Sequence, residues 1–138
     1  MSAKIERPLY ILDTSALLAL FRSEPGWEVV QAALGESAVC AINLTETITK
    51  LIRKGGEPRL VERYLRGLPM PILPWDEELA WESRDLAPPA WTRGISLAGR
   101  ACLAMARHLG AAAMTSDTKW AKLGLHVRVV LFRQGARP

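Results

Sequence analysis

Five short apolar runs without polar alternation recur along the chain. They occupy residues 9–12, 38–42, 71–73, 111–114 and 127–131. Runs of this kind are typical of parallel strands whose two faces are both covered by other elements. The hydrophobic pattern therefore predicts five buried strands.

Segments with the spacing of amphipathic helices lie between these runs. Apolar residues recur at helical intervals in 44–52 and again in 60–68. Ser96 is placed to cap a helix over residues 97–109, and Gly110 is placed to end it. Strands that alternate with helices predict an α/β fold, namely a three-layer α/β/α sandwich with a mainly parallel five-stranded sheet.

Length and composition agree with that architecture. The chain has 138 residues, of which 49% are hydrophobic and 23% are charged. These values exclude a disordered chain and a fibrous one. They predict one domain over residues 1–138, with flexible ends at about 1–7 and 134–138.

Apolar run length, cysteine content and net charge bear on the compartment of the protein and on the charge of its partners. No apolar run approaches the roughly 20 residues that a membrane helix needs, and the first residues do not resemble a signal peptide. Cys40 and Cys102 are too few for a disulfide scaffold, so we expect buried thiols in a reducing cytoplasm. The formal net charge of +4 favours a polyanionic partner without identifying it.

Acidic and polar side chains follow three of the predicted strands. Asp13 follows the first, and Asn43 and Glu46 follow the second on the first turn of the next helix. Thr115 and Asp117 follow the fourth. Because ligands of open α/β sheets bind beyond the carboxyl ends of the strands, the three carboxylates are expected to converge on one cleft.

Each carboxylate also has a structural interpretation. Asp13 and Asp117 could cap the helices that they precede, and Glu46 could pair with Lys50 one turn later. Caps do not explain why a glutamate occupies the equivalent place after the second strand. The joint pattern therefore favours a shared site.

The side chains around that site suggest its chemistry. Thr14, Ser15 and Thr115 could orient the carboxylates or bound waters, or could cap helices. Oxygen ligands without a nearby histidine or cysteine select Mg²⁺ or Mn²⁺. Such a cation can polarise a phosphoryl oxygen and activate water, so the sequence predicts metal-assisted hydrolysis of phosphodiesters.

Four blocks of sequence resemble PIN-domain proteins, most closely the VapC toxins of bacterial toxin–antitoxin pairs. They are YILDTSALLAL (10–20), INLTE (42–46), GISLAGRACLA (94–104) and TSDTKW (115–120), and they occur in the family's order. The resemblance implies a PIN fold and a Mg²⁺- or Mn²⁺-dependent endoribonuclease that cuts tRNA or ribosomal RNA. It also implies a homodimer and a VapB-like antitoxin partner. Asp13, Glu46 and Asp117 match the family's catalytic carboxylates and metal ligands.

Gly99 is the one departure from the family pattern, which has an aspartate ligand at this position. With Ser96 as the N-cap, an acidic residue at 99 would stabilise the helix N-terminus, whereas glycine costs up to about 1 kcal/mol. Helix stability therefore does not explain Gly99. A degenerate toxin, a loss-of-function change and a water in place of the ligand all remain open, and each predicts reduced metal affinity and cleavage.

Basic residues near the blocks could bind RNA phosphates, namely Arg93, Arg100 and Lys119, although solvated surface charge is the alternative. A second hypothesis is a catalytically inactive PIN fold that only binds an antitoxin or RNA. A third, an unrelated nucleotide-binding module, is disfavoured because the chain has no glycine-rich phosphate loop.

Overall fold

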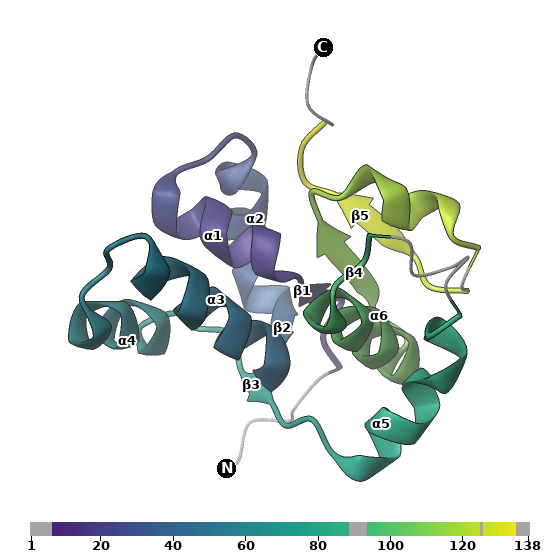
Figure 1. Ribbon diagram of the computed structural model, residues 1–138. Coiled ribbons are helices and arrows are strands. Elements are labelled where there is room, and N and C mark those ends of the chain that lie inside the picture. The colour runs from purple at the N-terminus through teal and green to yellow at the C-terminus, as the bar shows by residue number, and fades with distance from the viewer. Residues whose placement is uncertain (1–6, 89–93, 125, 135–138) are drawn as a thin grey trace, which may run out of the picture.

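Five parallel strands form one sheet in the order β3-β2-β1-β4-β5 (Figure 1). The computed structural model describes residues 7–88, 94–124 and 126–134. The strands are β1 (Tyr10–Leu12), β2 (Ser37–Cys40), β3 (Ile72–Leu73), β4 (Ala112–Thr115) and β5 (Val129–Leu131). The predicted parallel sheet is confirmed, while the predicted flexible ends lie almost wholly outside the described residues.

Within the described ranges, six α-helices and three short 3₁₀ helices connect the strands. The α-helices are α1 (Thr14–Arg22), α2 (Trp27–Ala33), α3 (Ala41–Arg53), α4 (Pro58–Arg66), α5 (Glu77–Glu82) and α6 (Leu97–Leu109). The 3₁₀ helices are η1 (Leu34–Glu36), η2 (Ser83–Leu86) and η3 (Thr118–Lys122). No described helix is both long enough and apolar enough to cross a bilayer.

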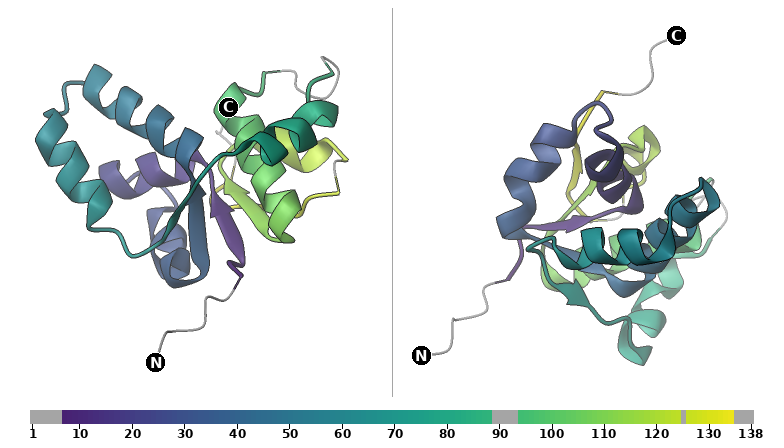
Figure 2. Two further views of the ribbon diagram at one scale, coloured as in Figure 1. Left: turned by 90° about the horizontal axis from the view of Figure 1, so that it is seen from below. Right: turned by 90° about the vertical axis from the view of Figure 1, so that its left-hand side faces the viewer.

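Helices cover both faces of the sheet, which makes the predicted three-layer sandwich (Figure 2). Alternate strand residues face opposite helical layers. In β1, Ile11 packs with residues of α5 and α6, whereas Leu12 packs with residues of α1 and α2. In β4, Ala113 packs on the α5–α6 side and Met114 on the α1–α2 side. The α3–α4 hairpin has a smaller core of its own, in which Leu51 packs with apolar residues of α4 and α1. Both faces of the sheet are thus buried, as apolar runs without alternation require.

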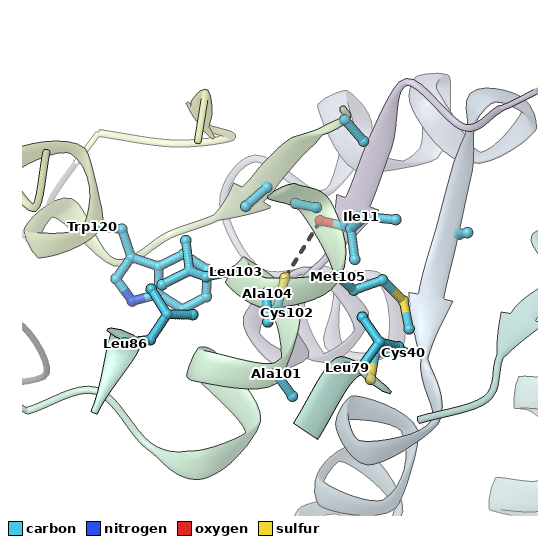
Figure 3. Packing of buried hydrophobic residues seen from close by; sticks show 14 residues of the cluster. Ile11, Cys40, Leu79, Leu86, Ala101, Cys102, Leu103, Ala104, Met105 and Trp120 are labelled. Atoms are coloured by element: carbon cyan, nitrogen blue, oxygen red, sulfur yellow. Dashed lines mark hydrogen bonds between the residues drawn. The ribbon is translucent and has the colours of Figure 1, made fainter. Parts of the chain in front are cut away.

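Helix α6 forms the centre of one layer, and local signals define both of its ends. Ser96 Oγ accepts a hydrogen bond from the Gly99 N–H at 3.0 Å, and Gly110 ends the helix at a φ of 68°. Cys102 lies against the sheet, with its Sγ 3.6 Å from the carbonyl oxygen of Ile11 (Figure 3). Cys40 and Cys102 are both buried and unpaired, as expected. The predicted helix over 97–109 is therefore confirmed at both ends.

The predicted boundary after the second strand is wrong. The apolar run at 38–42 predicts a strand to Ile42, but β2 ends at Cys40 and α3 begins at Ala41. Apolar residues continue across this junction, so hydrophobicity does not mark it. As a result Glu46 lies in the second turn of α3 and not in the first. The fifth strand is also shorter than its run, because β5 begins at Val129.

Candidate active site

The candidate site lies where the chain order of the sheet reverses. From β1 the chain continues to β2 on one side, whereas β4 pairs with β1 on the other side. Connections leave such a point in opposite directions and open a crevice at the carboxyl ends of the strands. Asp13 directly follows β1 there, and its backbone N–H donates to the carbonyl oxygen of Met114 in β4 at 2.9 Å.

The carboxylate of Asp13 is buried and held by three side chains. Its Oδ2 accepts hydrogen bonds from Thr115 at 2.9 Å and from Ser15 at 3.1 Å. Its Oδ1 accepts from Asn43 Nδ2 at 3.3 Å. Only 8% of Asp13 is exposed. Elements far apart in the sequence, namely α1, α3 and β4, therefore fix this carboxylate in one orientation.

Asn43 is the link between the strands and the helices around Asp13. Its side chain is fully buried, and its Nδ2 also lies 3.2 Å from Thr14 Oγ1 and 3.0 Å from the carbonyl oxygen of Ala98 in α6. The Thr14 hydroxyl in turn lies 3.5 Å from the Asn43 carbonyl oxygen. Thr14 and Asn43 thus bond to each other beside the Asp13 carboxylate.

Asp117 is oriented by the start of η3. Its Oδ1 accepts from the N–H of Lys119 at 3.0 Å, and its own N–H donates to Thr115 Oγ1 at 3.1 Å. The capping interpretation therefore holds for Asp117. It fails for Asp13, whose side chain makes no capping hydrogen bond to α1. The Thr115 hydroxyl therefore links the Asp13 carboxylate to the backbone N–H of Asp117.

One cleft brings the three carboxylates together. Asp13, Glu46 and Asp117 all line a hollow of about 420 Å³, which Thr14 and Ser15 also line. The predicted convergence of three strand ends is present in the structure. The alternative role of Glu46, an ion pair with Lys50, is not seen: among the described residues no salt bridge of 4.0 Å or less joins Glu46 to Lys50.

Burial and a neighbouring negative charge disfavour the ionised form of the Asp13 carboxyl. Burial raises the pKa of the Asp13 carboxyl above 3.8, and the negative charge of Glu46 raises it slightly further. The hydroxyls of Thr115 and Ser15 lower the pKa, by less than burial raises it. A cation in the cleft would offset the charge that this carboxylate carries when ionised.

The donor set of the cleft fits a hard divalent cation. Its candidate ligands are all oxygens, as Mg²⁺ and Mn²⁺ prefer. Within the described ranges, one group of three ligand atoms lies within 4.8 Å of one another, formed by Glu78, Glu82 and His108 on α5 and α6, away from the cleft. The carboxylates of the cleft stand further apart, which suits an ion that keeps several of its waters.

Gly99 is buried, and its neighbours explain why it is a glycine. A Cβ atom at this position would lie 2.8 Å from Ile95 Cγ2 and 3.0 Å from Trp120 Cζ2. Trp120 is only 4% exposed and packs in the core beside α6 (Figure 3). The space for a side chain at 99 is therefore filled by Ile95 and Trp120. Helix propensity could not reveal this reason, because it lies in tertiary packing.

The predicted basic residues have different positions relative to the cleft. The Nζ of Lys119 lies over Gly94, which lines the cleft, so closely that a Cβ there would collide with it. Arg100 is half-buried on α6 and does not line the cleft. Arg93 lies outside the described residues. The prediction missed Lys50, which lines the cleft one turn after Glu46.

Replacement of Asp13 by asparagine should make stability less sensitive to pH in metal-free buffer. Because the folded pKa of Asp13 is raised, the native state binds more protons than the unfolded state as pH rises above about 3.8. The wild-type protein therefore loses stability through that range, and Asp13→Asn avoids the loss. Urea unfolding from pH 3.5 to 8 measures the difference, which should grow with pH in favour of the variant.

Asp85→Asn is the control for this prediction and should have the opposite sign. A hydrogen bond from Arg107 lowers the pKa of Asp85, so its ionised form stabilises the fold above that pKa. This variant should lose stability relative to wild type as pH rises. A difference between Asp13→Asn and wild type that stays constant with pH would contradict our account of the buried carboxylate.

Comparison with known proteins agrees with this architecture. A family model for the PIN domain matches residues 10–125. Among curated proteins no relative matched the chain. The fold is similar to that of a DNA-bound VapBC from Salmonella typhimurium, with 14% identity, 91% of this chain and 99% of that chain covered, and a TM-score of 0.71.

Two further solved structures share the fold. FitAcB from Neisseria gonorrhoeae is 23% identical, with 89% of this chain and 97% of that chain covered and a TM-score of 0.69. A toxin–antitoxin complex from Klebsiella pneumoniae is 20% identical, with 91% and 98% covered and a TM-score of 0.68. The family match extends from β1 to beyond η3 and includes all three carboxylates, and on this ground the chain belongs to the PIN domain family.

Proposed function

We propose that the protein is a metal-dependent endoribonuclease, the toxin of a toxin–antitoxin pair, with activity reduced by Gly99. The observation that carries this proposal is the cleft in which Asp13, Glu46 and Asp117 meet at the switch point of the sheet. Membership of the PIN family and a fold shared with toxin–antitoxin complexes support it. The proposed substrate is tRNA or ribosomal RNA in the cytoplasm, where both cysteines would remain reduced thiols.

The residues of the cleft would have different roles in the proposed reaction. Asp13 and Asp117 would hold Mg²⁺ or Mn²⁺, and Glu46 would hold the ion or orient its water. When bound, the ion would polarise a phosphoryl oxygen and lower the pKa of the attacking water. The hydroxyls of Ser15 and Thr115 keep the Asp13 carboxylate in place, so it need not reorganise when substrate binds.

The proposed partners follow from the structural neighbours and the family resemblance. The neighbours named above are complexes that contain a toxin and its antitoxin, or VapBC and FitAcB assemblies. We therefore propose a VapB-like antitoxin that covers the cleft, and a homodimer as the assembled form. Copurification with an antitoxin encoded beside this gene, followed by mass measurement of the native complex, tests both.

A catalytically inactive binding module is the second candidate. The packing of Trp120 and Ile95 around Gly99 favours it, because the place of the fourth family carboxylate is filled by apolar side chains. Such a protein would bind RNA or antitoxin without cleaving RNA. Turnover in the presence of Mn²⁺ separates the two candidates.

Removal of a cleft carboxylate should abolish most RNA cleavage. Asp13→Asn, Glu46→Gln and Asp117→Asn should each lower the rate about 100-fold or more, because each removes a proposed ligand or water-orienting group. Total RNA incubated with Mn²⁺, and separately with chelator, gives the rates. Asp85→Asn is the matched control, because its carboxylate pairs with Arg107 outside the cleft.

Two results would contradict the nuclease proposal. One is cleavage by Asp13→Asn at the wild-type rate, which would indicate a contaminating nuclease. The other is intact RNA with the wild-type protein and with every variant, which would favour the binding module.

An aspartate at position 99 should raise activity only when Ile95 and Trp120 are both made smaller. Gly99→Asp alone should lower stability by about 1–3 kcal/mol, because its Cβ meets Ile95 and Trp120. In an Ile95→Ala/Trp120→Leu background, Gly99→Asp should increase Mn²⁺ affinity and cleavage at least about tenfold over that background alone. Calorimetry and the RNA assay measure both, and equal values in the two forms would show that Gly99 does not impair the site.

A further inference from the structure

A groove of about 440 Å³ adjoins the carboxylate cleft along α3. Glu46 and Lys50 line both hollows, so the groove and the cleft adjoin each other at these two residues. The far end of the groove is lined by Arg53, the last residue of α3, and its other wall by Leu97 and Ala98 of α6. Helices α3 and α6 pack against each other, which fixes the width of the groove.

Helical periodicity places the charged residues of the groove in one line. Glu46 and Lys50 are four residues apart, and Arg53 follows three residues later, so all three project from one face of α3. At a rise of about 1.5 Å per residue, Lys50 lies about 6 Å and Arg53 about 10 Å along the helix axis from Glu46. Lys50 and Arg53 therefore lie at increasing distances from Glu46 along the same face of α3.

Both cations are available for a ligand. Lys50 and Arg53 are exposed, and within the described part of the chain no salt bridge of 4.0 Å or less involves either of them. The two threonines that line the groove bond locally: the Thr49 hydroxyl donates to the carbonyl oxygen of Thr45 at 2.9 Å, and the Thr45 hydroxyl donates to that of Ala41 at 3.2 Å. The opposite wall is uncharged, and Leu97 is 62% exposed there.

We propose that Lys50 and Arg53 bind the phosphates of a single-stranded RNA segment that leaves the carboxylate cleft along α3. This inference rests on the proposed function, because a strand cut within the cleft must continue beyond it. The lysine ammonium binds phosphate oxygens as a compact point charge, and the planar arginine guanidinium binds them through two parallel hydrogen bonds. Exposed Leu97 gives ribose and base carbons an apolar surface on the opposite wall.

The adjacency of the two hollows, which share Glu46 and Lys50 in their lining, favours RNA over an acidic protein segment. A peptide held by these two cations alone would need only the groove, whereas a substrate strand needs the groove and the cleft together. Lys119 lies beside Gly94 on the η3 side of the cleft. Cations therefore border the carboxylates on both sides, as expected if RNA passes through.

Binding of a fluorescein-labelled, mixed-sequence, single-stranded RNA to the full chain tests the proposal. Fluorescence anisotropy in chelator measures Kd without cleavage, across a range of salt concentrations. Lys50→Glu/Arg53→Glu should weaken binding at least about tenfold and lower the slope of log K against log salt by about 1.4. Lys50→Gln/Arg53→Gln should show a smaller loss in the same direction.

Arg59→Glu/Arg63→Glu is the matched control, because it changes the net charge equally on the exposed surface of α4. It should weaken binding less than about threefold, and both double variants should keep the wild-type Tm. Equal losses in the two double variants would overturn the proposal while the proposed nuclease function stands.

Two other results would also overturn it. If Lys50→Glu/Arg53→Glu keeps full affinity for RNA but no longer binds a polyglutamate peptide, the groove binds an acidic protein. If the wild-type protein neither binds nor cleaves RNA, the proposed function fails together with this inference.

Discussion

The buried carboxylate of Asp13 is the constraint on which the rest of the site depends. It lies at the end of the central strand, where solvent cannot stabilise its charge, and burial raises its pKa. Side chains from α1, α3 and β4 satisfy its oxygens. The same hydrogen bonds place Thr115 between Asp13 and Asp117. A divalent cation bound in the cleft would offset the charge of this carboxylate when it is ionised.

The sequence predicted those parts of the fold whose signals are local or periodic. The ends of α6 are marked by Ser96 and Gly110, and apolar runs covered on both faces indicate a parallel sheet. The junction between β2 and α3 could not be predicted in the same way. Its cap, Cys40, makes no side-chain hydrogen bond, and apolar residues continue across it. Glu46 nevertheless lines the cleft, because a helix that begins at this strand end has its first turns beside the cleft.

The sequence also indicated which residues meet, but not how they are supported. Order along the chain and the carboxyl-end rule bring Asp13, Glu46 and Asp117 together. Residues distant in sequence then decide the details, as Asn43 does by bonding to the carbonyl oxygen of Ala98. Gly99 is the clearest example, because helix propensity argues against it and the contact with Trp120 explains it. Contacts of this kind between α6 and η3 leave no trace in local periodicity.

Binding of Mn²⁺ to the metal-free protein, followed by isothermal titration calorimetry, tests the central claim most directly. We expect one site in the wild-type protein that Asp13→Asn weakens at least about tenfold, since Asp13 is the most firmly positioned of the proposed oxygen ligands. Glu82→Gln, in the separate group on α5 and α6, should leave that site unchanged. Equal Mn²⁺ affinity in the wild-type protein and in Asp13→Asn would contradict the claim that the three carboxylates form one metal centre.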